Sequence, residues 1–224
     1  MRLPVIAPLV LCASPILAGE PIEEPFTCPV GGEEFTITGT LSCSQLGRTM
    51  LLRPVTSCDF VTLLPVCPGN GLPVYREFDA AEVEGLQQMI ASDDWTAMRA
   101  RPPWDRALAL ATWFEDREHQ FGLALNGLWQ DSGAVLADPA RLDRVLQEFE
   151  RRLAEQPDEG VLAALAGFAL LAAGRDAEAA TWLDRARTME LDDWGQAYLS
   201  AVEACRGQMA TEPCAPGAPF PPPN

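Results

Sequence analysis

Two short segments that each contain a cysteine have almost the same pattern, Cys28-Pro-Val-Gly31-Gly32 and Cys67-Pro-Gly-Asn70-Gly71. Cysteine supports two kinds of structural chemistry, because thiolates bind zinc and paired thiols oxidise to disulfides. A structural zinc site needs about four nitrogen or sulfur ligands, and these two segments supply one thiol each. The pattern therefore predicts either a disulfide or a metal site that other cysteines complete.

The start of the chain indicates the compartment in which these cysteines act. Residues 1–18 begin with Met1 and Arg2, continue through an uncharged apolar run and end at Ala18, before the first acidic residue, Glu20. A basic start, a short apolar stretch and a small residue before a polar region are typical of a secretory signal peptide. No later apolar run is long enough to span a bilayer, so we expect a soluble periplasmic or secreted protein with no membrane insertion after cleavage.

Six cysteines remain once the signal peptide is removed: Cys28, Cys43, Cys58, Cys67, Cys205 and Cys214. An even number of cysteines in an exported protein predicts a framework of disulfides, and the short spacing favours a bond between Cys205 and Cys214. The four N-terminal cysteines allow three pairings. The alternative is a zinc site made of Cys28, Cys43, Cys58 and Cys67 as thiolates. An oxidising compartment favours disulfides, so we expect no cofactor, with zinc as the alternative.

The formal net charge of −16 limits the possible partners. Nucleic-acid binding needs a basic patch, and none is visible, so we expect no nucleic-acid partner. The same charge argues against docking on anionic membrane surfaces.

Catalytic signatures are also missing from the sequence. His119 is the single histidine and lies in a charged stretch, which is typical of an exposed helix end. The sequence contains no nucleophile elbow, HExxH motif, phosphate loop or CxxC redox motif. Tryptophans more often anchor a core than stack on a ligand, so we expect this role for Trp95, Trp104, Trp113, Trp129, Trp182 and Trp194. We therefore expect a protein without enzymatic activity.

Composition divides the expected mature chain into four parts. Residues 19–25 form a polar leader, and residues 26–78 combine β-branched residues with frequent glycine and proline, which predicts a small β-rich segment. The strands are expected at residues 35–39, 50–55, 60–66 and 72–78. A segment this small has a marginal core, which the cysteines would stabilise. Residues 79–210 should form a helical domain and residues 211–224 a proline-rich tail, in which residues 215–224 are expected to be disordered.

Helix start signals repeat through the third part. Asp79 and Glu82 have the spacing of a capping box, and Pro103 suits the first position of a helix. Asp138-Pro139 precedes a regular apolar stripe that ends at Gln156-Pro157. The expected fold class is therefore α+β and mainly α.

Residues 161–190 resemble a tetratricopeptide repeat (TPR). Gly167 and Leu170 match the small and large positions of its first helix, and Gly174 matches the turn glycine. Ala179, Leu183 and Ala186 match the small, bulky and small positions of the second helix. The resemblance implies close packing of Gly167 against the second helix. A single good repeat cannot bury a continuous core, so the helices must also pack on other parts of the chain.

The order of these segments resembles a bacterial family of unknown function that has an N-terminal zinc-ribbon-like segment with CPxCG turns followed by TPR-like helices. The ribbon in this chain is degenerate, because Gly31 and Asn70 occupy the positions of the second thiolates. The resemblance implies that the two turns face each other, which favours Cys28–Cys67 and leaves Cys43–Cys58. It also implies a binding module. We therefore expect a protein-interaction module that binds a protein or peptide, with a metal-binding or redox-responsive protein as the alternative.

Overall fold

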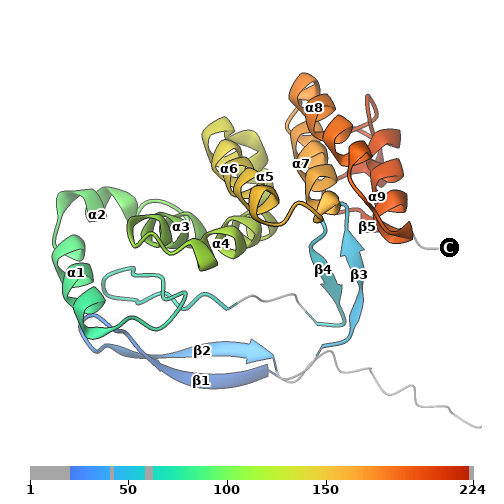
Figure 1. Cartoon of the computed structure of the whole chain (residues 1–224). Coiled ribbons are helices and arrows are strands. Elements are labelled where there is room, and N and C mark those ends of the chain that lie inside the picture. The colour runs from blue at the N-terminus through green and yellow to red at the C-terminus, as the bar shows by residue number, and fades with distance from the viewer. Residues whose placement is uncertain (1–20, 41–42, 59–62, 222–224) are drawn as a thin grey trace, which may run out of the picture.

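The computed structural model describes residues 21–40, 43–58 and 63–221. The protein is mainly helical, with nine α-helices and a small amount of antiparallel β-structure in the described part, which confirms the expected fold class. Figure 1 shows the helices in a curved row, with the two β-hairpins on one side of it. The expected signal peptide, residues 1–18, lies outside the described residues, as do residues 60–62 of the strand expected at residues 60–66.

The elements follow one another along the chain in a simple order. The helices are α1 (Ala80–Ile90), α2 (Asp93–Met98), α3 (Pro103–Trp113), α4 (Arg117–Gln130), α5 (Ser132–Ala137), α6 (Pro139–Glu155), α7 (Gly160–Ala172), α8 (Asp176–Thr188) and α9 (Asp193–Ala204). The strands are β1 (Pro21–Thr27), β2 (Glu34–Thr40), β3 (Gln45–Thr49), β4 (Pro54–Thr56) and β5 (Pro219–Phe220), and a short 3₁₀ helix, η1 (Glu212–Cys214), precedes β5. Among the described residues, no helix combines the length and apolar composition needed to cross a bilayer.

Helices α1 and α6 begin where the sequence predicts, because side chains satisfy their first amide groups. The carboxylate of Asp79 accepts from the N–H of Glu82, and the carboxylate of Glu82 accepts from the N–H of Asp79, each at 2.9 Å. This capping box starts α1. Asp138 caps α6, whose first residue is Pro139, a position at which proline loses no helical hydrogen bond.

The main hydrophobic core is formed by the helices from α3 to α9. Five of its fully buried side chains are Phe149, Phe168, Leu170, Leu183 and Tyr198. The helices do not form this core alone, because the tip of the β3–β4 hairpin also enters it. This insertion supplies the additional packing surface that a single helical repeat requires.

Helices α7 and α8 approach closely at Gly167. A Cβ atom at this position would lie 2.6 Å from Cδ2 of Leu183 and 3.6 Å from the carbonyl oxygen of Ala179. The turn between the helices contains Gly174 with a φ of +73°, a conformation that glycine adopts without strain. The small residues of this stretch therefore set the distance between the two helices.

Replacing Gly167 by alanine is expected to lower the free energy of unfolding by about 1–3 kcal/mol, because the added methyl group overlaps the buried Leu183 side chain. Urea unfolding measures the effect. The matched control is Gly122→Ala in α4, where no atom lies within 4 Å of the new Cβ. That variant should gain about 0.5–1 kcal/mol from helix propensity. Equal effects of the two substitutions would contradict the close approach.

The N-terminal strands differ from the expectation in several places. The expected strand at residues 35–39 lies within β2, but residues from Pro21, expected as a polar leader, form β1 and pair antiparallel with β2. Prolines fit here because each strand of a two-stranded ribbon has one unpaired edge. Residues 50–53 form a turn instead of a strand, because the side chains of Met50 to Leu52 enter the core. Residues 72–78 contribute only an isolated bridge, between Pro73 and Val66.

A second sheet joins the β3–β4 hairpin to the last strand of the described chain. Strand β3 is central, with β4 on one side and β5 on the other. Residues 215–224 of the proline-rich tail were expected to be disordered, but they contain β5, in which Phe220 is buried, and η1 precedes them. Two side chains hold the hairpin tip on the helices: the Tyr198 hydroxyl donates to the Met50 carbonyl at 2.7 Å, and Trp129 Nε1 donates to the Leu51 carbonyl at 2.8 Å.

A smaller core joins the two cysteine turns to the first helices. Its buried members are Cys28, Cys67, Leu72, Leu86, Trp95 and Leu110. Residues 26–78 therefore contribute to both cores and share each of them with helices. The two cysteine turns belong to the smaller core, and the β3–β4 hairpin between them in the sequence packs into the main core.

Candidate binding groove

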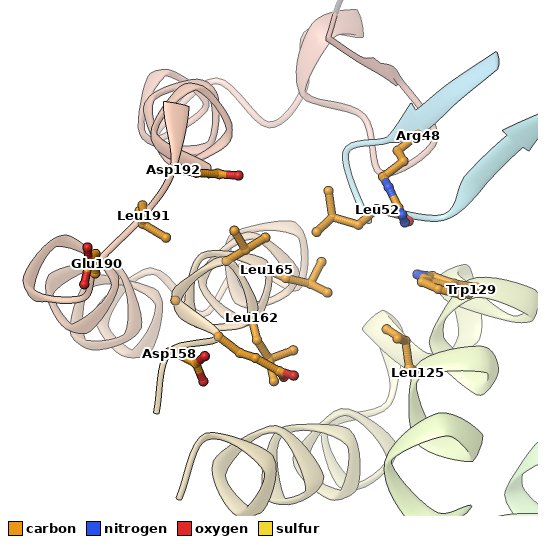
Figure 2. A pocket seen from close by; sticks show the side chains of 13 residues that line it. Arg48, Leu52, Leu125, Trp129, Asp158, Leu162, Leu165, Glu190, Leu191 and Asp192 are labelled. Carbon is orange, nitrogen blue, oxygen red and sulfur yellow. The ribbon is translucent and has the colours of Figure 1, made fainter. Parts of the chain in front are cut away.

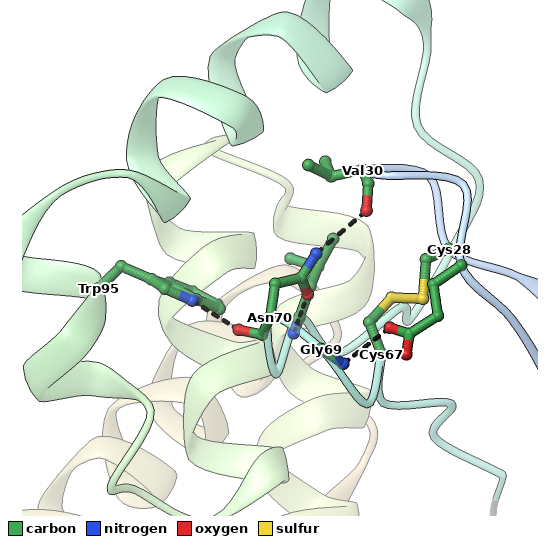
Figure 3. Close-up of a disulfide and its surroundings, with 8 residues drawn as sticks. Cys28, Val30, Cys67, Gly69, Asn70 and Trp95 are labelled. Carbon is green, nitrogen blue, oxygen red and sulfur yellow. Dashed lines mark hydrogen bonds between the residues drawn. A yellow bond between two sulfur atoms is a disulfide. The ribbon is translucent and has the colours of Figure 1, made fainter.

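The two cysteine turns have the same backbone hydrogen bonds and are joined by a disulfide between Cys28 and Cys67 (Figure 3). In each turn the cysteine N–H donates to the carbonyl group five residues later, and the glycine N–H four residues later donates to the cysteine carbonyl, at 2.8–3.2 Å. The Cα atoms of the two cysteines are 5.7 Å apart, and both side chains are buried. The turns thus face each other, as the resemblance implies.

Asn70, at the position of a second thiolate, connects the two turns by hydrogen bonds (Figure 3). Its Nδ2 donates to the Val30 carbonyl at 3.0 Å, and its Oδ1 accepts from the N–H of Leu72 at 2.9 Å. Trp95 Nε1 donates to the Asn70 carbonyl at 2.9 Å. At the corresponding position of the other turn, Gly31 has a φ of +91°, so a cysteine there would be strained. Hydrogen bonds and a disulfide hold this pair of turns together.

The remaining cysteines also form disulfides, Cys43–Cys58 and Cys205–Cys214, with Cα atoms 5.7 and 5.4 Å apart. Cys205–Cys214 is the pair that the sequence spacing favours, and Cys43–Cys58 is the pair that the resemblance implies. A zinc site of Cys28, Cys43, Cys58 and Cys67 would require two of the three bonds to be reduced to thiolates. Three disulfides are consistent with an oxidising environment outside the cytosol.

The single histidine is part of an ion-pair network rather than an isolated exposed side chain. His119 Nδ1 lies 2.9 Å from Oδ1 of Asp116, and Arg76 Nε donates to the other carboxylate oxygen at 2.6 Å. The Arg76 guanidinium also donates to both carboxylate oxygens of Glu82, which holds the pKa of Glu82 below its usual range. Burial raises the pKa of the neighbouring Tyr75 hydroxyl. The network connects α1 to the start of α4, a role in positioning helices.

A groove with a volume of about 520 Å³ opens beside the hairpin tip (Figure 2). It lies between α4, the start of α7, the loop from α8 to α9 and the β3–β4 hairpin. Its apolar lining consists of Leu52, Leu125, Trp129, Val161, Leu162, Leu165 and Leu191. A volume of this size, with mostly apolar walls, lies in the range of ligand-binding pockets, about 300–1,000 Å³.

Charged residues stand on two sides of the groove. The four carboxylates Asp158, Glu159, Glu190 and Asp192 belong to the loop before α7 and to the α8–α9 loop. They lie at one end of the α7–α8 pair because α7 begins where the antiparallel α8 ends. The guanidinium of Arg48 comes from β3 and is seen on the opposite side in Figure 2.

Leu52 shapes the wall between these charged sides. It is a buried residue at the hairpin tip with a φ of +59°, a left-handed conformation that costs a branched side chain free energy. The Leu52 N–H donates to the Thr49 carbonyl at 2.8 Å, and the Leu52 carbonyl accepts from Arg48 Nη1 at 3.1 Å. The tight turn therefore positions both an apolar wall and the single cation of the groove.

Sequence reasoning did not find this groove. The sequence contains a signal for one half of the groove. Two acidic segments, Asp158-Glu159 and Glu190 to Asp192, flank two neighbouring helices, and antiparallel packing of these helices brings the segments together. The sequence contains no signal for the other half of the groove, because the β3–β4 hairpin lies far from these helices in the sequence. Of the tryptophans, Trp95 is a core anchor as expected, Trp129 lines the groove, and Trp113 and Trp194 are exposed.

No protein-family model, curated protein or solved structure matches this chain.

Proposed function

We propose that this chain is an exported protein-interaction module without enzymatic activity, whose groove binds a segment of polypeptide. The observation that carries the proposal is the groove itself, an open cavity of about 520 Å³ with apolar walls and charged rims. Polypeptide segments combine apolar side chains with polar backbone and charged groups, so they suit such a lining. The resemblance of residues 161–190 to a TPR supports the same function.

The proposed compartment is the periplasm or the exterior of a bacterial cell. The apolar N-terminus and the three disulfides support this location. In that compartment the disulfides stabilise the scaffold, and the groove provides the recognition surface.

Selection from a displayed library of random peptides tests the proposal. We expect the protein to enrich peptides that bind with dissociation constants in the micromolar range, about −8 kcal/mol at 1 µM. Leu125→Gln places a polar amide on the groove wall and should weaken binding of the enriched peptides about tenfold. Isothermal titration calorimetry measures the dissociation constants.

The matched control is Leu46→Gln, which makes the same change on an exposed leucine of β3 outside the groove. This variant should bind the peptides like the wild type. Failure to enrich any peptide, or equal weakening by both substitutions, would contradict groove binding.

A further inference from the structure

We infer that the groove selects peptide segments in which an arginine or lysine lies beside apolar side chains. This inference rests on the proposed peptide binding and states which peptides the groove selects. It follows from the balance of charges around the cavity and from the partners that each charged group already has.

The floor of the groove requires apolar contacts. Leu52, Leu162 and Leu165 face the cavity together (Figure 2), and the partly exposed side chains of Leu125, Trp129 and Leu191 continue this apolar surface. Apolar surface gains free energy when a ligand removes it from water. A ligand that carried charge alone would leave this surface exposed to water, so the partner needs apolar side chains.

Two of the four carboxylates already have partners. Glu159 forms an ion pair with Arg152 at 2.6 Å. Asp192 caps α9, and its carboxylate accepts from the N–H of Gly195 at 2.7 Å. These two groups contribute negative charge to the rim while their hydrogen bonds keep them in place.

The other two carboxylates, Asp158 and Glu190, form no ion pair within 4 Å and no side-chain hydrogen bond in the described part of the chain, although the charge of Asp158 interacts with the Arg152 guanidinium that pairs with Glu159. They stand on the same side of the groove, one before α7 and one after α8 (Figure 2). A cation with an aliphatic stem could lie over the apolar floor and reach them, which is how arginine and lysine side chains usually bury their stems.

A preference of the groove for an anionic ligand has weaker support. Arg48 and the positive ends of the α7 and α9 dipoles could attract an anion. However, the Arg48 guanidinium already donates to the Leu52 carbonyl, and the Asp192 carboxylate occupies the start of α9. The net charge of −16 adds a long-range field that attracts cations and repels anions.

The enriched peptides provide the test. We expect arginine or lysine next to leucine, isoleucine or valine, and replacement of that arginine by the neutral isostere citrulline should weaken binding about fivefold. In the double variant Asp158→Asn/Glu190→Gln, the arginine-to-citrulline ratio should fall below about twofold, because the charges that distinguish the two peptides are gone. High salt should reduce the same ratio in the wild type.

The control double variant is Glu84→Gln/Asp93→Asn, which removes the same charge from exposed positions on α1 and α2. It should keep the wild-type ratio. Enriched peptides that lack a cation, that carry aspartate or glutamate instead, or that bind equally well with citrulline would overturn the inference while leaving peptide binding intact. Failure to enrich any peptide would overturn both.

Discussion

Replacing Cys28 and Cys67 together by alanine is expected to lower the free energy of unfolding by about 4 kcal/mol. The bond closes a loop with a sequence separation of 39 residues, so its loss frees a large part of the unfolded chain. Both sulfur atoms are also buried in the smaller core, and the alanine side chains leave that space partly unfilled. Urea unfolding of the oxidised protein measures the change.

The double variant Cys205→Ala/Cys214→Ala is the matched control. Its loop separation is 9 residues, so the same argument gives a loss of about 2.7 kcal/mol. Equal losses for the two bonds would contradict the explanation by loop length. Thiol titration and metal analysis of the native wild-type protein complete the experiment, because four free thiols with one bound zinc would favour the alternative metal-binding protein.

Replacing Trp95 by alanine is expected to lower the free energy of unfolding by about 3–5 kcal/mol, since this is the usual cost of removing a large aromatic side chain from a core. Trp95 is 1% exposed and packs with the disulfide and with α1 and α3 in the smaller core. Its indole N–H also donates to the Asn70 carbonyl, so the substitution leaves that acceptor without its partner.

Two further variants separate packing from hydrogen bonding. Trp95→Phe keeps an aromatic ring without the donor and should lose less than the alanine variant. Trp113→Ala removes a tryptophan that is 51% exposed and should cost about 1 kcal/mol. A loss at Trp113 as large as that at Trp95 would show that Trp95 does not anchor the smaller core. Urea unfolding monitored by circular dichroism gives all three values.

The helices were predictable because their signals are local. Asp79, Pro103 and Asp138 lie within a few residues of the amide groups they satisfy or the turns they start, so short stretches of sequence contain the needed information. The strands were less predictable because their partners are distant. Strand β5 is two residues long and forms only against β3, and Met50 to Leu52 look like a strand but form a buried turn. Their environment comes from helices much later in the chain.

The two sides of the candidate groove also differ in how far they could be predicted from the sequence. The acidic loops at one end of α7 and α8 follow from the antiparallel pairing of two neighbouring helices, which the pattern at Gly167 and Gly174 indicates. The opposite wall depends on Arg48 and Leu52, whose position relative to α7 no local rule specifies. The sequence therefore contained a signal for one side of the site that was not recognised, and only tertiary packing supplied the other.

The pairing of β3 with β5 affects the order of events in synthesis. Arg48 and Thr49 pair with Phe220 and Pro219, and the N–H of Met50 donates to the Ala218 carbonyl. During synthesis the apolar tip of the β3–β4 hairpin is therefore present long before β5, the strand that pairs with β3, has been made. The helices can form earlier, but the main core closes only after Ala218 to Phe220 have been synthesised and pair with the hairpin. A chain truncated before Ala218 would lack this final closure.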